Sequence, residues 1–93
     1  MKNSNEQAEL LAIKALSFIA EDEDRISRFL ALSGLDAGDV REQISDPVFQ
    51  GGVLDYLLQY EPDLIEFAQW AEIDPALPLK LRHLLPGSIQ EDY

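Results

Sequence analysis

The sequence predicts an all-α protein, a compact bundle of five to six short helices arranged as two pseudo-repeated helical units. Apolar residues recur at helical spacing, capping residues and prolines separate the apolar segments, and one stretch of chain resembles another lying 38 residues further on. The 93 residues, 46% of them hydrophobic, suit one domain that buries its own core. We expect that single helical domain over residues 6–85, between a disordered N-terminus (1–5) and a flexible C-terminal tail (86–93).

The first half contains three predicted helices. The first covers about residues 6–20 and is apolar over most of its circumference, so it should lie near the centre of the bundle. The acids at 21–24 suit the positive end of a second helix, which runs to about Ser33 and stops at Gly34. Asp36 can then cap a short third helix.

The second half begins with a fourth helix. Asp46 and Pro47 predict its start, because an N-cap acid is followed by proline at the first helical position, and it runs to about Tyr60. Gly51 and Gly52 lie inside it, and each should cost about 1 kcal/mol relative to alanine. They mark either a weak first turn or a close approach to the first helix.

Prolines then divide the rest of the chain. Pro62 begins a fifth helix, and a last regular helix begins only near Pro78, since proline restricts the residue before it and has no N–H to donate. This last helix should end by residue 85.

Residues 16–36 align without a gap on residues 54–74, at a constant offset of 38. In both stretches a mostly buried helix ends, an acidic turn follows, and a second amphipathic helix stops at an aspartate that caps a third. Any two helix-turn-helix pairs share apolar spacing, but the register carried through two turns favours an internally repeated three-helix unit. The first and fourth helices should then pack at the centre. The identical pairs are Leu16/Leu54, Glu23/Glu61, Phe29/Phe67 and Asp36/Asp74.

The charge of the chain disfavours several classes of partner. Eighteen acids against seven bases give a net charge of −11, and residues 42–79 contain no Lys or Arg. Such a chain repels phosphates, so direct nucleic-acid binding and binding to anionic membranes are both disfavoured. The polar N-terminus and the interrupted apolar stretch behind it suit neither a signal peptide nor a membrane span, so we expect a cytoplasmic protein. The lack of cysteine excludes disulfides and thiolate catalysis.

No segment carries a recognisable catalytic, cofactor or metal motif, so we expect a protein that is not an enzyme and binds no cofactor. The acids at 21–24 lack the spaced ligands and the glycine of a calcium loop. His83 stands with Lys80 and Arg82 at a basic helix end rather than in a motif with a nucleophile. Residues 29–44 resemble a helix-turn-helix, but its second helix carries too many acids to read DNA.

Two runs of the sequence, ALSFIAEDEDRISRFLALSGLDAGDVR and DPVFQGGVLDYLLQYEPDLIEFAQWAEIDP, resemble a family of small helical proteins known mainly from alphaproteobacteria, domain of unknown function 3572. The resemblance covers about residues 6–85 and rests on packing and capping positions at 29–36, 54–58 and 61–62. It implies a helical fold and a cytoplasmic bacterial origin. It brings no activity, cofactor or catalytic residue with it.

These properties favour a non-enzymatic protein–protein interaction module that presents an acidic face to an unidentified protein partner with a basic surface. An acidic nucleic-acid-mimicking decoy or regulator that binds a DNA-binding protein is one alternative, and an accessory subunit of an enzyme is another. The aromatic content also allows a homodimer. Aromatic residues at helical spacing are more often core than contact, but tryptophan is enriched at interface hot spots. The candidate partner-binding residues are Asp55, Tyr60, Asp63, Glu66 and Trp70.

Overall fold

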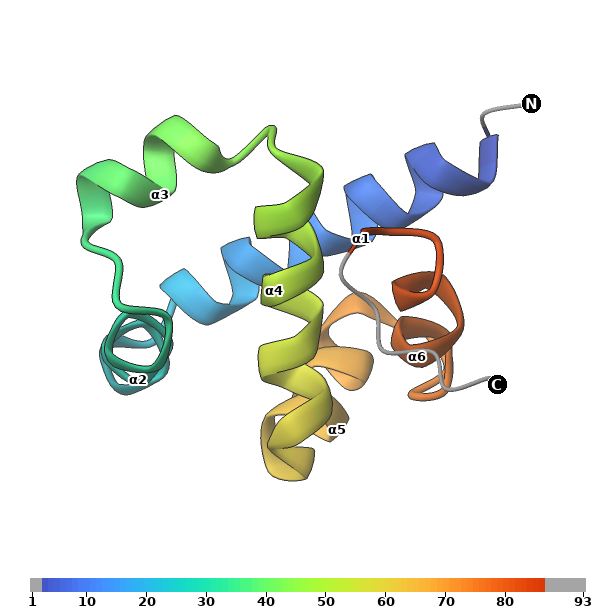
Figure 1. Cartoon of the computed structure of the whole chain (residues 1–93). Helices are drawn as coiled ribbons and strands as arrows, with labels where there is room; N and C mark the ends of the chain where they lie inside the picture. The colour runs from blue at the N-terminus through green and yellow to red at the C-terminus, as the bar shows by residue number, and fades with distance from the viewer. Residues whose placement is uncertain (1–2, 87–93) are drawn as a thin grey trace.

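The computed structural model describes residues 3–86, and within them the fold is all-α, as predicted (Figure 1). The helices in this range are α1 (Asn3–Ala20), α2 (Glu23–Ser33), α3 (Ala37–Gln43), α4 (Pro47–Gln59), α5 (Glu61–Ala71) and α6 (Leu77–Arg82). α1 begins three residues before its predicted start. Residues 1–2 of the predicted disordered N-terminus and residues 87–93 of the predicted tail lie outside the described residues, whereas residues 3–5 belong to α1; the domain limits stay predictions.

Helices α1 and α4 cross at the centre of the bundle, as predicted for the first and fourth helices (Figure 1). α1 contacts α2, α4, α5 and α6, and α4 also contacts α5 and α6. Two phenylalanines from the outer helices join this core. Phe29 of α2 contacts Phe49 and Tyr56 of α4. Phe67 of α5 contacts Phe18 of α1. The buried apolar cluster is Ala8, Leu11, Ala12, Ala15, Leu16, Phe18, Ile19, Phe29, Phe49, Val53, Leu54, Tyr56, Leu57, Phe67 and Leu85.

Aspartates cap three of the helices, and the caps predicted at Asp36 and Asp46 both form. Asp22, Asp36 and Asp46 precede α2, α3 and α4, and each accepts a hydrogen bond from a backbone N–H in the first turn. Asp39 accepts in return from the N–H of Asp36, which completes a capping box. Gly34 ends α2 in the left-handed conformation, with φ of 75°. These helix boundaries follow from contacts within one turn of chain.

The two glycines of α4 differ in their surroundings. A Cβ atom at Gly51 would lie 2.9 Å from Cζ of Arg82, whereas nothing lies within 4 Å of a Cβ at Gly52. The close approach at Gly51 is therefore to a side chain of α6. One of the two predicted explanations was a close approach to the first helix, and that partner is wrong. Gly52 is exposed, and no close approach accounts for it.

The last helix begins where the prolines predict. Pro78 lies in the first turn of α6 and is buried. The last turn carries Lys80 and Arg82, as expected of a basic helix end. The side chain of Arg82, however, is buried rather than solvated, which the sequence did not indicate.

Helix bounds recur at the offset of the predicted repeat. Glu23–Ser33 shifted by 38 positions is Glu61–Ala71, so α2 and α5 begin and end at equivalent residues. Gly34 and Glu72, also 38 apart, both take the left-handed conformation, with φ of 75° and 61°. The duplication itself stays a prediction.

Candidate functional site

The predicted binding residue Asp63 is an internal group. It lies in the first turn of α5 with only 6% of its surface exposed. Its Oδ2 accepts hydrogen bonds from Nη1 of Arg28 and from the hydroxyl of Tyr56, both at 3.1 Å. The same Nη1 donates to the Tyr56 oxygen at 3.0 Å, which closes a triangle between α2, α4 and α5. Asp63 therefore ties three helices together and is not available to a partner.

This triangle perturbs two of its members. Burial raises the pKa of the Tyr56 phenol above its ordinary value of 10.0, and the hydrogen bond from Arg28 opposes this rise. The hydrogen bond with Tyr56 raises the pKa of Arg28, which stays charged. Tyr56 thus remains a neutral donor to the Asp63 carboxylate up to alkaline pH.

Glu66 remains accessible, but an arginine of α2 lies against it. Nη1 of Arg25 is 3.4 Å from Oε1 of Glu66, whose side chain is well exposed. Arg25 is anchored more firmly elsewhere. Its Nη2 donates to the carbonyl of Phe18 at 2.9 Å, and its Cζ lies 3.8 Å from the centroid of the Phe18 ring. The Glu66 contact is therefore a surface ion pair of small energy.

Trp70 is both a core residue and a surface residue. Its indole packs on Phe18 at a centroid distance of 5.6 Å and on Phe67 at 6.0 Å, yet 43% of its surface is exposed. Tyr60 is 41% exposed and lies under the guanidinium of Arg28. The two aromatics are ten residues apart, about 15 Å along a helix at 1.5 Å per residue, and both are exposed, so their role as partner contacts stays a prediction.

Asp55 is held by an arginine that the sequence did not mark as a site residue. Its two carboxylate oxygens accept from Nε and Nη2 of Arg82 at 2.7 and 3.0 Å. Nη1 of Arg82 donates to the carbonyls of Leu85 and Pro86. Gly51 and Asp55, four residues apart on α4, form the receptor for this guanidinium. The spacing of this glycine and this acid on one helix face is the feature of the sequence that could have indicated a site for an arginine.

Several acids expected to form an acidic face are paired with arginines. Arginines from outside the segment pair with three of the eight acids in residues 42–79, namely Asp55, Asp63 and Glu66. The other five are exposed, and they are Glu42, Asp46, Glu61, Glu72 and Asp74.

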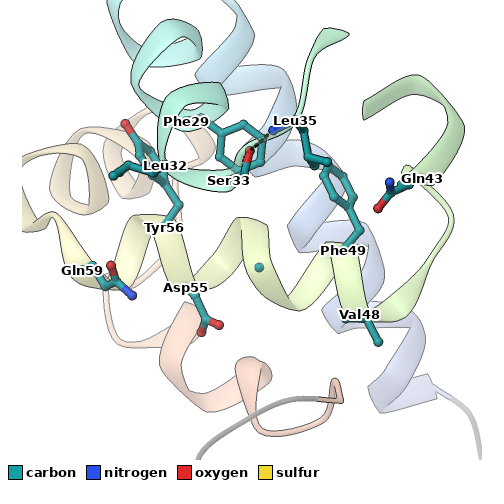
Figure 2. A pocket seen from close by; sticks show the side chains of 11 residues that line it. Phe29, Leu32, Ser33, Leu35, Gln43, Val48, Phe49, Asp55, Tyr56 and Gln59 are labelled. Atoms are coloured by element: carbon teal, nitrogen blue, oxygen red, sulfur yellow. Dashed lines mark hydrogen bonds between the residues drawn. The ribbon is translucent and has the colours of Figure 1, made fainter. Parts of the chain in front are cut away.

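A groove runs between α2 and α4, closed at one end by α3 (Figure 2). Figure 2 shows Phe29 and Leu32 of α2 facing α4 across it. Its volume is about 380 Å³, within the range of small ligand sites. We call this the α4 groove, and it is lined by Phe29, Leu32, Ser33, Leu35, Gln43, Val48, Phe49, Gly52, Asp55, Tyr56 and Gln59.

Two aliphatic side chains at the mouth of the α4 groove are largely exposed, Leu32 at 70% and Val48 at 61%. Asp55 is the charged residue among the described residues that line the groove. Of the predicted binding residues, only Asp55 belongs to this groove. The other four, at Tyr60 and along α5, stand out in the sequence by charge and aromatic character, whereas the groove depends on how α2 packs beside α4.

A second groove lies between α1 and α6. Its volume is about 410 Å³, and Lys14 is the charged residue among the described residues that line it. We call this the α1 groove, and it is lined by Gln7, Leu10, Leu11, Ile13, Lys14, Ile73, Leu77 and Leu81.

Within residues 3–86, no helix combines the length and the apolar character needed to cross a membrane. Over the same range, no three histidine or carboxylate side chains gather where they could hold a metal ion. Residues 5–88 match the model of one protein family, which is described as a protein of unknown function (DUF3572). No curated protein and no solved structure shows significant similarity to the chain.

Proposed function

Because the chain belongs to the DUF3572 family, whose description assigns no activity, we propose a function from the geometry: a non-enzymatic protein–protein interaction module that docks a basic partner in the α4 groove. This proposal keeps the interaction role expected from the sequence. It moves the docking surface from the predicted acidic face, residues 42–74, to the side of α4 that faces α2.

The observation that carries the proposal is the pair of exposed aliphatic side chains at the mouth of a preformed groove. Leu32 and Val48 together leave most of their apolar surface in water. Covering such surface stabilises a complex by about 25 cal/mol per Å² before the costs of association. Contiguous apolar surface with a polar rim is typical of interaction sites.

The walls of the groove are fixed by the core beneath them. Phe29 packs edge-on against Phe49 at a centroid distance of 6.1 Å and against Tyr56 at 5.6 Å. Tyr56 is held in turn by Arg28 and Asp63. A groove with such walls needs little ordering when a partner binds, so less of the interaction energy is lost.

Charge sets the kind of partner. Residues 29–59, which provide all of the groove, contain five acids and one base, and Arg82 pairs with one of these acids, Asp55. The remaining surplus of acids in this part of the chain favours association with a basic segment and makes the rate of association dependent on salt. A partner with a basic, amphipathic segment fits both the apolar floor and the acidic surroundings.

The test is affinity capture from nuclease-treated lysate of the native cell at low and high salt, with three immobilised baits. These are the wild-type chain, the groove variant Leu32→Ser/Val48→Ser, and the control variant Leu79→Ser. Leu79 is also an exposed leucine, at 53%, but it lines neither groove. We expect a basic protein that wild type and control retain, that the groove variant loses, and that high salt releases. Equal capture by all three baits would refute docking in the α4 groove.

A further inference from the structure

Ring contacts in the core are reciprocal at the offset of 38. Phe18 contacts Phe67 at a centroid distance of 5.5 Å, and Phe29 contacts Tyr56 at 5.6 Å. At this offset Tyr56 is the counterpart of Phe18, and Phe67 is the counterpart of Phe29. Each contact is therefore the image of the other.

The ion pairs between α2 and α5 follow the same rule. Arg25 pairs with Glu66, and Arg28 pairs with Asp63. Asp63 is the counterpart of Arg25 at the offset of 38, and Glu66 is the counterpart of Arg28. In each pair, therefore, an arginine contacts the counterpart of the other arginine. A two-fold axis produces contacts of this kind, in which a first residue contacts the counterpart of a second residue and the second residue contacts the counterpart of the first. Here that relation holds between two parts of one chain.

The two grooves correspond under this relation. Five residues that line the α4 groove have their counterparts in the α1 groove, and the pairs are Leu35/Ile73, Gln43/Leu81, Val48/Leu10, Phe49/Leu11 and Gly52/Lys14. Val48 and Leu10 are also similarly exposed, at 61% and 63%.

The grooves differ at one end. The α4 groove continues along α4 to Tyr56 and Gln59, whereas the α1 groove stops at Lys14. The counterpart of Tyr56 is Phe18, and in this half of the molecule the indole of Trp70 covers it. The position equivalent to Trp70 is occupied by Leu32, which is 70% exposed. Trp70 and Phe18 line neither groove, whereas the α4 groove extends to Leu32 and Tyr56, so the α4 groove has an open end that the α1 groove lacks.

We infer that the open end of the α4 groove binds a tryptophan side chain of a protein partner, in the place that Trp70 takes on the other side of the molecule. The proposal rests on the proposed docking function and names its anchor. Phe29 and Tyr56, which are 3% and 6% exposed, form the floor beneath the indole, Leu32 flanks it, and the Gln59 amide oxygen lines the same end as an acceptor for its N–H.

Charge complementarity selects the residues around that anchor. Residues 29–59, which provide the α4 groove, contain five acids and one base, and Arg82 pairs with one of these acids, Asp55. The α1 groove, by contrast, has Lys14 on its wall. We therefore expect the partner tryptophan to stand beside lysines or arginines, in a short segment rather than a whole folded face, because a groove of about 380 Å³ takes one large side chain.

The probe for this site is N-acetyl-tryptophanamide, added to the full chain and followed by amide chemical shifts, with N-acetyl-alaninamide as the control ligand. We expect saturable shifts at Leu32, Ser33, Gly52 and Gln59 with the tryptophan amide and none with the alanine amide. A synthetic peptide with lysines on both sides of one tryptophan should bind more tightly than the free amide, and salt should reduce that gain.

The decisive variant is Leu32→Trp, which places an indole at the position equivalent to Trp70. Leu32 is exposed, so the substitution should leave the fold intact, and the new indole should occupy the groove. Saturable shifts should then be lost, whereas the control variant Leu79→Trp should bind like wild type. In a Trp70→Phe background, the emission of the Leu32→Trp indole should be blue-shifted relative to that of Leu79→Trp, which reports directly whether it is buried.

Three results would overturn the inference: shifts that do not saturate, shifts confined to the α1 groove, or unchanged binding by Leu32→Trp. The proposed function is tested separately. If the groove variant Leu32→Ser/Val48→Ser loses its captured partner while the tryptophan amide fails to bind, the docking groove stands and the tryptophan anchor is wrong.

Discussion

The two adjacent glycines of α4 should respond to alanine with opposite signs. Alanine in a helix interior is favoured over glycine by about 1 kcal/mol, so each substitution starts from the same gain. At Gly52 nothing lies within 4 Å of the added Cβ, and Gly52→Ala should stabilise the protein by about 1 kcal/mol.

At Gly51 the added methyl group meets the guanidinium of Arg82. Its Cβ would lie 2.9 Å from Cζ and 3.0 Å from both terminal nitrogens. Ordinary carbon contacts need about 3.5–4.0 Å, so the guanidinium would have to retreat by about 0.5–1 Å. The Arg82 side chain is only 5% exposed, and it is held by Asp55 and by the carbonyls of Leu85 and Pro86.

The cost of that retreat decides the sign. A hydrogen bond to a charged group contributes about 1.5–3 kcal/mol, and the buried guanidinium cannot replace a lost bond with water. Losing one such bond outweighs the helix-propensity gain, so Gly51→Ala should destabilise the protein by about 0.5–2 kcal/mol. The two variants should therefore differ by about 1.5–3 kcal/mol.

The assay is urea unfolding followed by circular dichroism, with midpoints and m-values for both variants. The control is the same pair in an Arg82→Met background, where the obstacle is absent and Gly51→Ala should stabilise as Gly52→Ala does. The reasoning fails if Gly51→Ala raises the unfolding midpoint of the otherwise wild-type chain as much as Gly52→Ala does.

Three further predictions use other local features. Glu72→Gly should stabilise the protein by about 1 kcal/mol, since φ is 61° at a position that favours glycine, and Gly34→Ala should have the opposite effect in the same thermal unfolding series. The pKa of Tyr56 is raised on folding, so its contribution to stability is complete below the unfolded value near 10.0 and is lost as the pH rises through the folded value. Tyr56→Phe should flatten the alkaline loss of stability measured by urea unfolding from pH 9 upward, and an unchanged slope would contradict the assignment. Asp36→Ala should cost about 1 kcal/mol by removing the capping box, with faster hydrogen exchange in α3, which has no buried residue; protection of α3 at the wild-type level would argue against a role for the cap.

Much of the helical pattern was predictable because its causes are local. Asp36 and Asp46 cap helices through N–H groups two or three residues away, and Gly34 ends α2 through its own backbone conformation. Pro78 places the start of α6 to within one residue. The central position of α1 followed from a helix that is apolar on almost every side.

The candidate site was less predictable, because it depends on which helices become neighbours. Asp63 and Asp55 appeared as surface acids in a stretch without bases, yet Arg28 and Arg82 reach them from 35 and 27 residues away. The α4 groove joins side chains of α2, α3 and α4, and only Asp55 among its lining residues was predicted as a contact.

The sequence by itself thus determined the helices, their caps and the excess of acid, since these follow from contacts within a turn and from composition. Tertiary structure alone decided which acids face the solvent, which arginine is buried, and where a groove remains open. The physical reason is distance along the chain. An ion pair or a groove between helices forms only when packing brings together residues that no local spacing connects, as when Arg25 meets Glu66 from 41 positions away.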